Sequence, residues 1–455
     1  TCRRSGRKKT VEAYRRTPLK GSAPHRRITA LLRHLETFYD NVCNHNHALP
    51  EAAVDMGAWQ KVFEQILRET WEGKIKPGEL SDAHIAQTYE ELNKGMQQGW
   101  GGTAENELPD QSVLRMQQNL YKFSAAKDAS MQLEINQQLY DKNGNLLPFD
   151  EFKTKLDSLG IKYNKTWLQT EYRTAKQSGQ TAQFWQDIQA NKALYPNLKY
   201  KTQEDDRVRD EHQTLNNIVK PVDDEFWNNY YPPNGWNCRC FTVQTAEDAT
   251  TDENMPKITD KDVRPEFRMN VGKTGQVFNE DSKSGHRFFA LAKESPDWRK
   301  RFELSKLEGG FNTVKTPKGN KIKVSIYAHE KDLNKNLKNA IIIADQLDFA
   351  VKIRPHLDGE IIRNVPNPEY LINSKIADRK SPEGMKQYNL LRKSQKQGCE
   401  IVVFDMENWP REESLYIKKL KNSLKDESHY PVIKEIIIIS KDGKAKHWMR
   451  KDFVK

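Results

Sequence analysis

The chain has 455 residues, of which 36% are hydrophobic and 30% charged, and its formal net charge is +11. This length leaves room for two or three domains. No run approaches the roughly 20 consecutive apolar residues of a membrane span, so we expect no membrane contact. The five cysteines form an odd, scattered set, which argues against a disulfide scaffold and for a reducing cytosol.

The positive charge is concentrated at the two ends of the chain. Residues 1–30 hold 10 Lys and Arg against one Glu, and residues 311–455 hold 29 against 19 acidic residues. Basic ends around an acidic middle indicate different partners for different parts. We expect residues 1–30 to be a disordered basic tail, with a nucleic-acid-binding arm as the alternative.

Helices dominate the pattern before residue 245. Apolar residues recur at helical spacing in 48–74, 81–101, 113–139, 148–160 and 166–194. Ser81 stands where it would cap the second helix, and Gly160 where it would stop the fourth. We therefore expect a largely helical domain over residues 31–245. The polar, aperiodic stretch that follows predicts a linker with a connecting helix over residues 246–310.

Beyond residue 310 the pattern changes to strands alternating with helices. Strands are expected at 321–328, 349–355, 400–406 and 432–440, and helices at 331–347, 384–397 and 411–424. Residues 370–380 predict a hairpin that turns at Asn373 and Ser374. Residues 311–455 should thus form a compact α+β domain with a small antiparallel or mixed sheet.

The stretch "YPPNGWNCRC" at residues 231–240 has the most unusual composition in the chain. Its prolines and glycine predict an irregular loop, from which Cys238 and Cys240 lead into a strand. His212 could approach both thiols, although three ligands are one short of the usual four of zinc. A zinc site is therefore a weak candidate, and the alternative is a loop locked by small buried side chains.

The same region carries a family resemblance. Asp206, Arg207, Arg209 and His212, followed by "PVDDEFW" and "PPNGWNCRC", resemble the signature of phage Mu F-like minor head proteins. The likeness extends over roughly residues 50–245. It implies a virion protein that works with portal, capsid and scaffold proteins in head morphogenesis. It also implies a structural role for the motif residues His212, Cys238, Arg239 and Cys240.

A second resemblance lies near the C-terminus. The segment "VKIRPHLDGEIIRNVPNPEYLINSKIADRKSPEG" is similar to toxin-type nuclease domains grouped as barnase, EndoU, colicin and RelE-like. Such domains occur at the ends of phage head proteins and of contact-dependent bacterial toxins. The resemblance implies a nuclease toxin, first of all a ribonuclease, with an immunity protein as partner. It places the chain in the virion and in the host bacterial cytoplasm.

Metal-independent RNA cleavage needs a base, an acid and cations beside the phosphate. The residues clustered in sequence that could supply these groups are Arg354, His356, Glu369, Asp378, Arg379 and Lys380. His356 is the best single acid or base, because an ordinary histidine titrates at a pKa of about 6.5. Arg354 and Lys380 would contact phosphate. This interpretation needs no cofactor.

A rival interpretation uses the same segment differently. Asp378 and Lys380 form an Asp-x-Lys pattern with Glu369 and Asp358 upstream, and the order helix, three strands, helix, strand is also that of metal-dependent restriction-type nucleases. Two carboxylates would then hold Mg²⁺, and the lysine would help to activate water. The basic charge suits any polyanion and leaves RNA and DNA open. A third alternative is a structural head protein whose C-terminal domain binds nucleic acid or capsid without cleavage.

Overall fold

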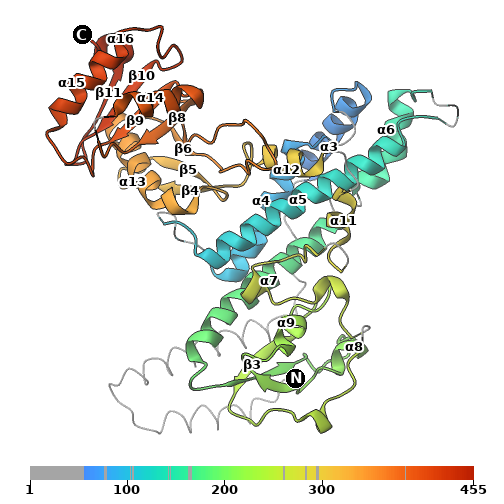
Figure 1. Ribbon diagram of the computed structural model, residues 1–455. Coiled ribbons are helices and arrows are strands. Elements are labelled where there is room, and N and C mark those ends of the chain that lie inside the picture. Colours follow the sequence, from blue (N-terminus) through green and yellow to red (C-terminus); the bar gives the residue numbers. More distant parts are fainter. Residues whose placement is uncertain are drawn as a thin grey trace. The chain divides into compact units, whose positions relative to one another are not determined.

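The computed structural model describes residues 56–455, apart from gaps at 76–78, 103, 105–106, 142, 144, 162–166, 260–261, 282–283, 294–296 and 385. The basic tail expected at residues 1–30 lies outside the described residues. Figure 1 follows the remaining elements in chain order. No helix in the described part of the chain combines the length and the apolar character that a membrane span requires.

Long helices build the first part of the described chain. They are α3 (Met56–Trp71), α4 (Asp82–Trp100), α5 (Gln111–Gln137), α6 (Phe149–Ile161) and α7 (Leu168–Asn191). Each of them matches one of the segments that the apolar spacing predicted, although α5 begins two residues before its segment and α6 ends one residue after its own. Ser81 caps α4 as expected, because its Oγ accepts a hydrogen bond from the backbone N of His84 at 3.4 Å. Buried side chains of these helices form one continuous core.

Glycines let α4 and α7 pack closely. A Cβ atom at Gly99 would lie 1.8 Å from the carbonyl oxygen of Lys176, and one at Gly179 would lie 2.1 Å from that of Met96. No side chain fits at either position, so the two backbones approach each other directly.

Gly160 does not stop α6, contrary to the expectation from sequence. The helix continues to Ile161, and a Cβ atom at Gly160 would lie 2.6 Å from Cε1 of Phe63 on α3. The glycine is therefore needed for close packing of α6 against α3 rather than for ending the helix.

One ion pair and one histidine–aspartate contact are buried between α4, α5 and α7. Lys127 Nζ donates to Glu171 Oε2 at 2.6 Å, and His84 Nδ1 lies 2.9 Å from Asp128 Oδ1. Burial lowers the pKa of Lys127 and raises that of Glu171, while their contact opposes both shifts. Buried charges of this kind persist only when they are paired.

The segment expected to be a linker supplies part of the helical core. It contains η3 (Asp252–Asn254), η4 (Pro265–Phe267), α10 (Val271–Thr274), α11 (Arg287–Lys293) and α12 (Trp298–Ser305). Eight of its side chains are buried with those of α3–α7, namely Val271, Val277, Phe278, Phe288, Phe289, Ala292, Trp298 and Phe302. The stretch packs through short, irregular elements, which is why it shows no periodic pattern.

A small antiparallel sheet follows α7. Its order is β2-β1-β3, with β1 (Asn197–Lys201), β2 (Val219–Pro221) and β3 (Phe241–Thr245). The short helices α8 (Asp210–Gln213) and α9 (Phe226–Tyr230) lie in its connections. Cys238 and Cys240 are buried in the core beside this sheet, and β3 begins immediately after Cys240, as the sequence predicted.

The C-terminal part contains a mixed sheet of eight strands in the order β11-β10-β9-β8-β7-β6-β5-β4. These strands are β4 (Phe311–Lys315), β5 (Lys321–Ser325), β6 (Val351–Ile353), β7 (Tyr370–Ile372), β8 (Lys375–Lys380), β9 (Ile401–Asp405), β10 (Glu435–Ile439) and β11 (Ala445–Met449). Strands β6, β7 and β8 pair antiparallel, whereas β8, β9 and β10 run parallel. The sheet is mixed, as predicted.

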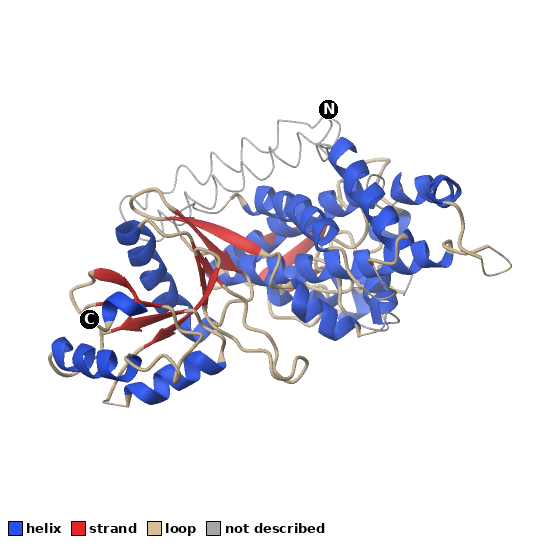
Figure 2. Ribbon diagram, turned by 90° about the horizontal axis from the view of Figure 1, so that it is seen from above, coloured by secondary structure: helices blue, strands red, loops and turns tan. Residues whose placement is uncertain are grey.

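Helices cover both faces of this sheet (Figure 2). The face with α13 (Glu330–Leu347) and the face with α14 (Gln387–Lys396) and α15 (Glu413–Leu424) have separate cores, and α16 (Arg450–Phe453) ends the chain. The β7–β8 hairpin turns at Asn373 and Ser374, whose φ values of 48° and 65° are those of a tight hairpin turn. The elements α13, β6, β7, β8, α14 and β9 follow one another in this order. The residues that the sequence predicted as catalytic lie on or beside β6, β7 and β8.

Candidate functional site

An aspartate and a lysine share one face of β8, the face turned towards α14 and α15. Asp378 pairs across the sheet with Val402, and Lys380 with Phe404, both of which belong to that core. Lys380 Nζ donates to Asp378 Oδ2 and lies 3.4 Å from Gln397 Oε1. Asp378 is fully buried, and its other oxygen, Oδ1, has no hydrogen-bond partner among the described residues. Burial raises the pKa of Asp378, and the contact with Lys380 opposes this shift.

Arg354 and Glu369 border the same carboxylate. Glu369 directly precedes β7, whose Tyr370 pairs with Ala377, the residue before Asp378. The backbone N of Arg354 donates to the carbonyl oxygen of Glu369 at 2.8 Å. Burial lowers the pKa of Arg354, and the charge of Asp378 is among the groups that oppose this shift. Of the six residues predicted from sequence, the sheet thus brings Arg354, Asp378 and Lys380 together, with Glu369 at the adjoining strand end.

Cys399 is a member of this group that sequence reasoning missed. Its thiol is buried, and burial, reinforced by Asp378, raises its pKa to about 12. The thiol therefore stays protonated. A lone cysteine just before a strand gives no sequence signal for such a position.

Arg379, between the two site residues, points to the opposite face. Its Nε donates to Asn336 Oδ1 at 2.7 Å, and its Nη2 lies 3.2 Å from Asp332 Oδ1, both on α13. Asp405 at the end of β9 lies 3.6 Å from Nη1. The backbone N of Arg379 donates to Glu369 Oε2 at 2.9 Å, which fixes that carboxylate at the strand end. Arg379 therefore ties β8, β9 and α13 together.

His356 has a different set of neighbours. It is exposed on the loop after β6, and its ring centroid lies 4.9 Å from that of His329, which precedes α13. Partial desolvation, together with the nearby His329 and Lys306, lowers the pKa of His356. His329 in turn lies 3.0 Å from Asp332. Asp358, two residues after His356, donates its backbone N to Glu303 Oε2 at 3.0 Å.

The Asp378 group has the chemistry of a site for a hard cation. Its Oδ1 is a buried oxygen with no hydrogen-bond partner among the described residues. Glu369, at the adjoining strand end, carries a second carboxylate, whose Oε2 accepts a hydrogen bond from the backbone N of Arg379. Mg²⁺ sites commonly use one or two carboxylates and complete their coordination with water and substrate phosphate. Asp378 and Glu369 thus offer the type of ligand atom that such an ion prefers.

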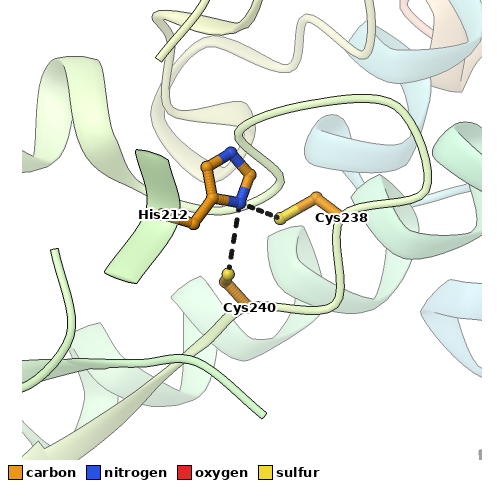
Figure 3. Close-up of side chains that lie close together, drawn as sticks. All are labelled: His212, Cys238 and Cys240. Atoms are coloured by element: carbon orange, nitrogen blue, oxygen red, sulfur yellow. Dashed lines mark hydrogen bonds between the residues drawn. The ribbon is translucent and has the colours of Figure 1, made fainter. Parts of the chain in front are cut away.

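A second constellation lies beside the small sheet, where an imidazole meets two thiols (Figure 3). His212 Nδ1 lies 3.8 Å from Cys238 Sγ and 3.5 Å from Cys240 Sγ. Each of the three residues is 4% exposed. Contacts with Cys240 and with His212 lower the pKa of the Cys238 thiol, whereas the neighbouring Cys238 and burial raise that of Cys240.

Two arginines hold the loop that carries these thiols. Arg239 forms a two-pronged ion pair with Asp205 at 2.8 and 2.6 Å. Arg209 Nη2 donates to the carbonyl oxygen of Trp236 at 2.5 Å, and a Cβ atom at Gly235 would lie 2.7 Å from Arg209 Nη1. Asp205 was not among the residues predicted from sequence, although it stands next to the quoted motif.

Comparisons with known proteins agree with these two halves. Residues 110–243 match the family model described as phage Mu protein F like protein. The chain therefore contains a phage Mu F-like segment. This segment includes His212, Cys238, Arg239 and Cys240, so the resemblance noted in the sequence is confirmed.

Two curated relatives match parts of the chain. The "Putative capsid assembly protein F" of Escherichia phage Mu is 47% identical over 68 residues, which is 15% of this chain and 15% of that protein. The Mu-like prophage FluMu F protein of Haemophilus influenzae is 31% identical over 98 residues, 22% of each chain. The matches thus span less than a quarter of either relative.

Residues 366–445 match the model of the contact-dependent growth inhibition CdiA C-terminal domain. This toxin-like segment begins before Glu369 and includes Asp378 and Lys380, so the predicted toxin resemblance of the C-terminal part is confirmed. Among solved structures, a CdiA-CT/CdiI toxin and immunity complex from Burkholderia pseudomallei is 18% identical. It covers 26% of this chain and 85% of its own, with a TM-score of 0.21.

Proposed function

We propose that the chain is a phage minor head protein that carries a nuclease toxin as its C-terminal domain. The Mu F-like segment and its likeness to a capsid assembly protein support the head role. Portal, capsid and scaffold proteins are the partners that this role calls for, and the virion is its location. The match to a CdiA C-terminal domain supports the toxin role, which requires an immunity protein in the producing cell.

The observation that carries the nuclease proposal is the pairing of Asp378 with Lys380 on one face of β8, near Arg354. Glu369 lies at the same strand end, where its Oε2 accepts from the backbone N of Arg379. The element order α13, β6, β7, β8, α14, β9, with β9 parallel to β8, is the order expected of metal-dependent restriction-type nucleases. This arrangement favours cation-dependent cleavage of nucleic acid in the toxin-like segment over the metal-independent mechanism.

Asp378 and Glu369 would hold a divalent cation, which would polarise a phosphate oxygen and acidify a bound water. Lys380 Nζ, held by Asp378 Oδ2, would stabilise negative charge that develops beside it. Arg354 would pair with a phosphate of the substrate. The Arg379 contacts would keep β8 and the Glu369 carboxylate in position.

A second candidate mechanism is metal-independent ribonuclease action by the His356–His329 pair. The two rings lie 4.9 Å apart, and the lowered pKa of His356 keeps its imidazole neutral and able to accept a proton at pH 7. Under this mechanism His356 would act as the base, and the buried Asp378 group would be structural.

Cleavage assays on the purified full chain separate these mechanisms. The chain is incubated with total RNA and with duplex DNA, each with added Mg²⁺ or with EDTA. For cation-dependent cleavage we expect EDTA to abolish activity, and Asp378→Asn and Lys380→Met each to reduce it by about 100-fold or more. His356→Ala should then have a small effect.

Lys375→Met is the matched control, because Lys375 lies on the same strand and pairs with Glu435 instead of Asp378. It should retain near wild-type cleavage. If EDTA has no effect and His356→Ala is the severe variant, the metal-independent mechanism holds. If the chain cuts neither RNA nor DNA and its expression is harmless to the cell, the nuclease proposal is wrong. The C-terminal domain would then be a module that binds its partner without cleaving it.

A further inference from the structure

The buried thiol–imidazole cluster is independent of the proposed nuclease site. It consists of His212 from α8 and of Cys238 and Cys240 from the loop before β3. The potential ligand atoms of these residues all lie within 4.8 Å of one another. Among the described residues, this is the group of three or more His, Cys, Asp or Glu side chains placed to share one ion.

The distances in the cluster match the edges of a metal tetrahedron. Zinc binds Cys sulfur at about 2.3 Å and His nitrogen at about 2.0–2.1 Å, which places sulfur and nitrogen about 3.6 Å apart at tetrahedral angles. The observed separations from His212 Nδ1 are 3.5 Å to Cys240 Sγ and 3.8 Å to Cys238 Sγ. A central ion therefore fits between the three atoms with little movement of the side chains.

Hydrogen bonding explains part of the arrangement, because Cys240 also interacts with Tyr200 and with Cys238, but it does not explain why both thiols approach one imidazole nitrogen. Both sulfurs approach the same nitrogen, Nδ1 of His212. A ring nitrogen has either one lone pair or one N–H, so it can make one well-aligned hydrogen bond and not two. If the three atoms are instead ligands of one central ion, both thiols can approach the same nitrogen without competing for one hydrogen bond. The donor set of one nitrogen and two thiols is also the set that selects Zn²⁺ among abundant cations.

We propose that His212, Cys238 and Cys240 bind one zinc ion, with water completing four ligands. The ion is structural, because each ligand is 4% exposed and the site joins the short helix α8 to the irregular 231–240 loop. The flanking Arg239–Asp205 and Arg209–Trp236 contacts hold the same loop from outside the cluster. Zinc thus fixes a loop that has little regular secondary structure of its own.

The test uses the full chain with Cys2 and Cys43 changed to Ser, so that thiol signals come from the three described cysteines. Metal analysis after purification should find about one zinc per chain. Cys238→Ser, Cys240→Ser and His212→Ala should each lose most of this zinc. The matched control Cys399→Ser, which removes a buried thiol of the C-terminal sheet, should keep it.

Two further measurements do not depend on whether the variants fold. A strong chelator should lower the Tm of the unmutated chain by about 5 °C or more, and zinc alone should restore it. Cobalt added to the metal-free chain should give the visible absorption of thiolate-bound tetrahedral Co²⁺.

The proposal is overturned if the purified chain lacks zinc and fails to bind it when zinc is added. It is equally overturned if mass spectrometry finds Cys238 and Cys240 joined as a disulfide in the native protein. Zinc retained in both serine variants would place the ion elsewhere.

Discussion

Replacing Asp378 by Asn tests whether this residue is kept for function rather than for stability. The carboxylate is fully buried, one of its oxygens has no partner among the described residues, and burial is the largest influence on its raised pKa. Keeping the Asp378 carboxylate ionised in this buried position therefore destabilises the folded state. Asn has nearly the same shape and carries no charge, and the Lys380 side chain, at 13% exposure, keeps some contact with water.

We expect Asp378→Asn to raise the free energy of unfolding at pH 7 by about 0.5–2 kcal/mol, the range typical of substitutions that relieve a functional site. For a unit of this size, each kcal/mol raises the Tm by about 2–4 °C. The pH dependence has a definite sign. In the unfolded chain Asp378 ionises near its ordinary pKa of 3.8, and in the folded chain at higher pH. The wild type therefore loses stability relative to the variant as pH rises through this window, and the difference stays constant above it.

Urea denaturation of both proteins between pH 3 and pH 8, with intrinsic fluorescence as the signal, measures this difference. Cleavage activity of the same samples should fall by about 100-fold or more, so that stability and activity change in opposite directions. If Asp378→Asn instead destabilises the chain by more than about 1 kcal/mol at pH 7, the Asp378–Lys380 contact is a structural ion pair. The argument from the buried carboxylate to function would then be wrong.

Two further predictions concern the helical part. Lys127→Met should cost about 3–5 kcal/mol in urea denaturation, because it leaves the Glu171 carboxylate buried without its partner, and adding Glu171→Leu should recover most of the loss. A double variant no better than the single one would contradict this account. Gly179→Ala should cost about 1–3 kcal/mol in thermal denaturation, because its Cβ would lie 2.1 Å from the carbonyl oxygen of Met96. Gly359→Ala, whose Cβ would meet nothing within 4 Å, is the control and should be near neutral.

The carboxylate–lysine group was predictable because its geometry follows from local sequence. The turn at Asn373 and Ser374 fixes the register of β7 and β8, and that register puts Glu369 and Asp378 at the same end of the hairpin. Strand alternation then places Lys380 on the same face as Asp378. The placement of His356 was not predictable in this way, because it lies on a loop whose path depends on contacts with residues far away in sequence.

The inward orientation of Arg379 could not be predicted from sequence. An arginine on a strand is expected at the surface, but Arg379 is held by Asn336 and Asp332, more than 40 residues earlier in the chain. The burial of Phe278 and Phe288 could not be predicted from sequence for a related reason. Their segment lacks periodicity, and Phe278 is buried because its ring stacks on Phe123 of α5 at 3.8 Å. Partners distant in sequence leave no local pattern.

The net positive charge of the C-terminal part and the single negative charge of Asp378 in its candidate site have different physical effects. The excess of Lys and Arg over residues 311–455 attracts any polyanion and gives no information on chemistry. The residue that bears on chemistry is Asp378, a carboxylate buried among cationic side chains. A surface that served only to bind phosphate would have no negative charge at its centre, because that charge would repel the phosphate. Asp378 is tolerated there because Lys380 contacts it and Arg354 lies nearby, and its Oδ1 has no hydrogen-bond partner among the described residues. A binding module would gain nothing from that oxygen, whereas a cation-dependent nuclease requires it.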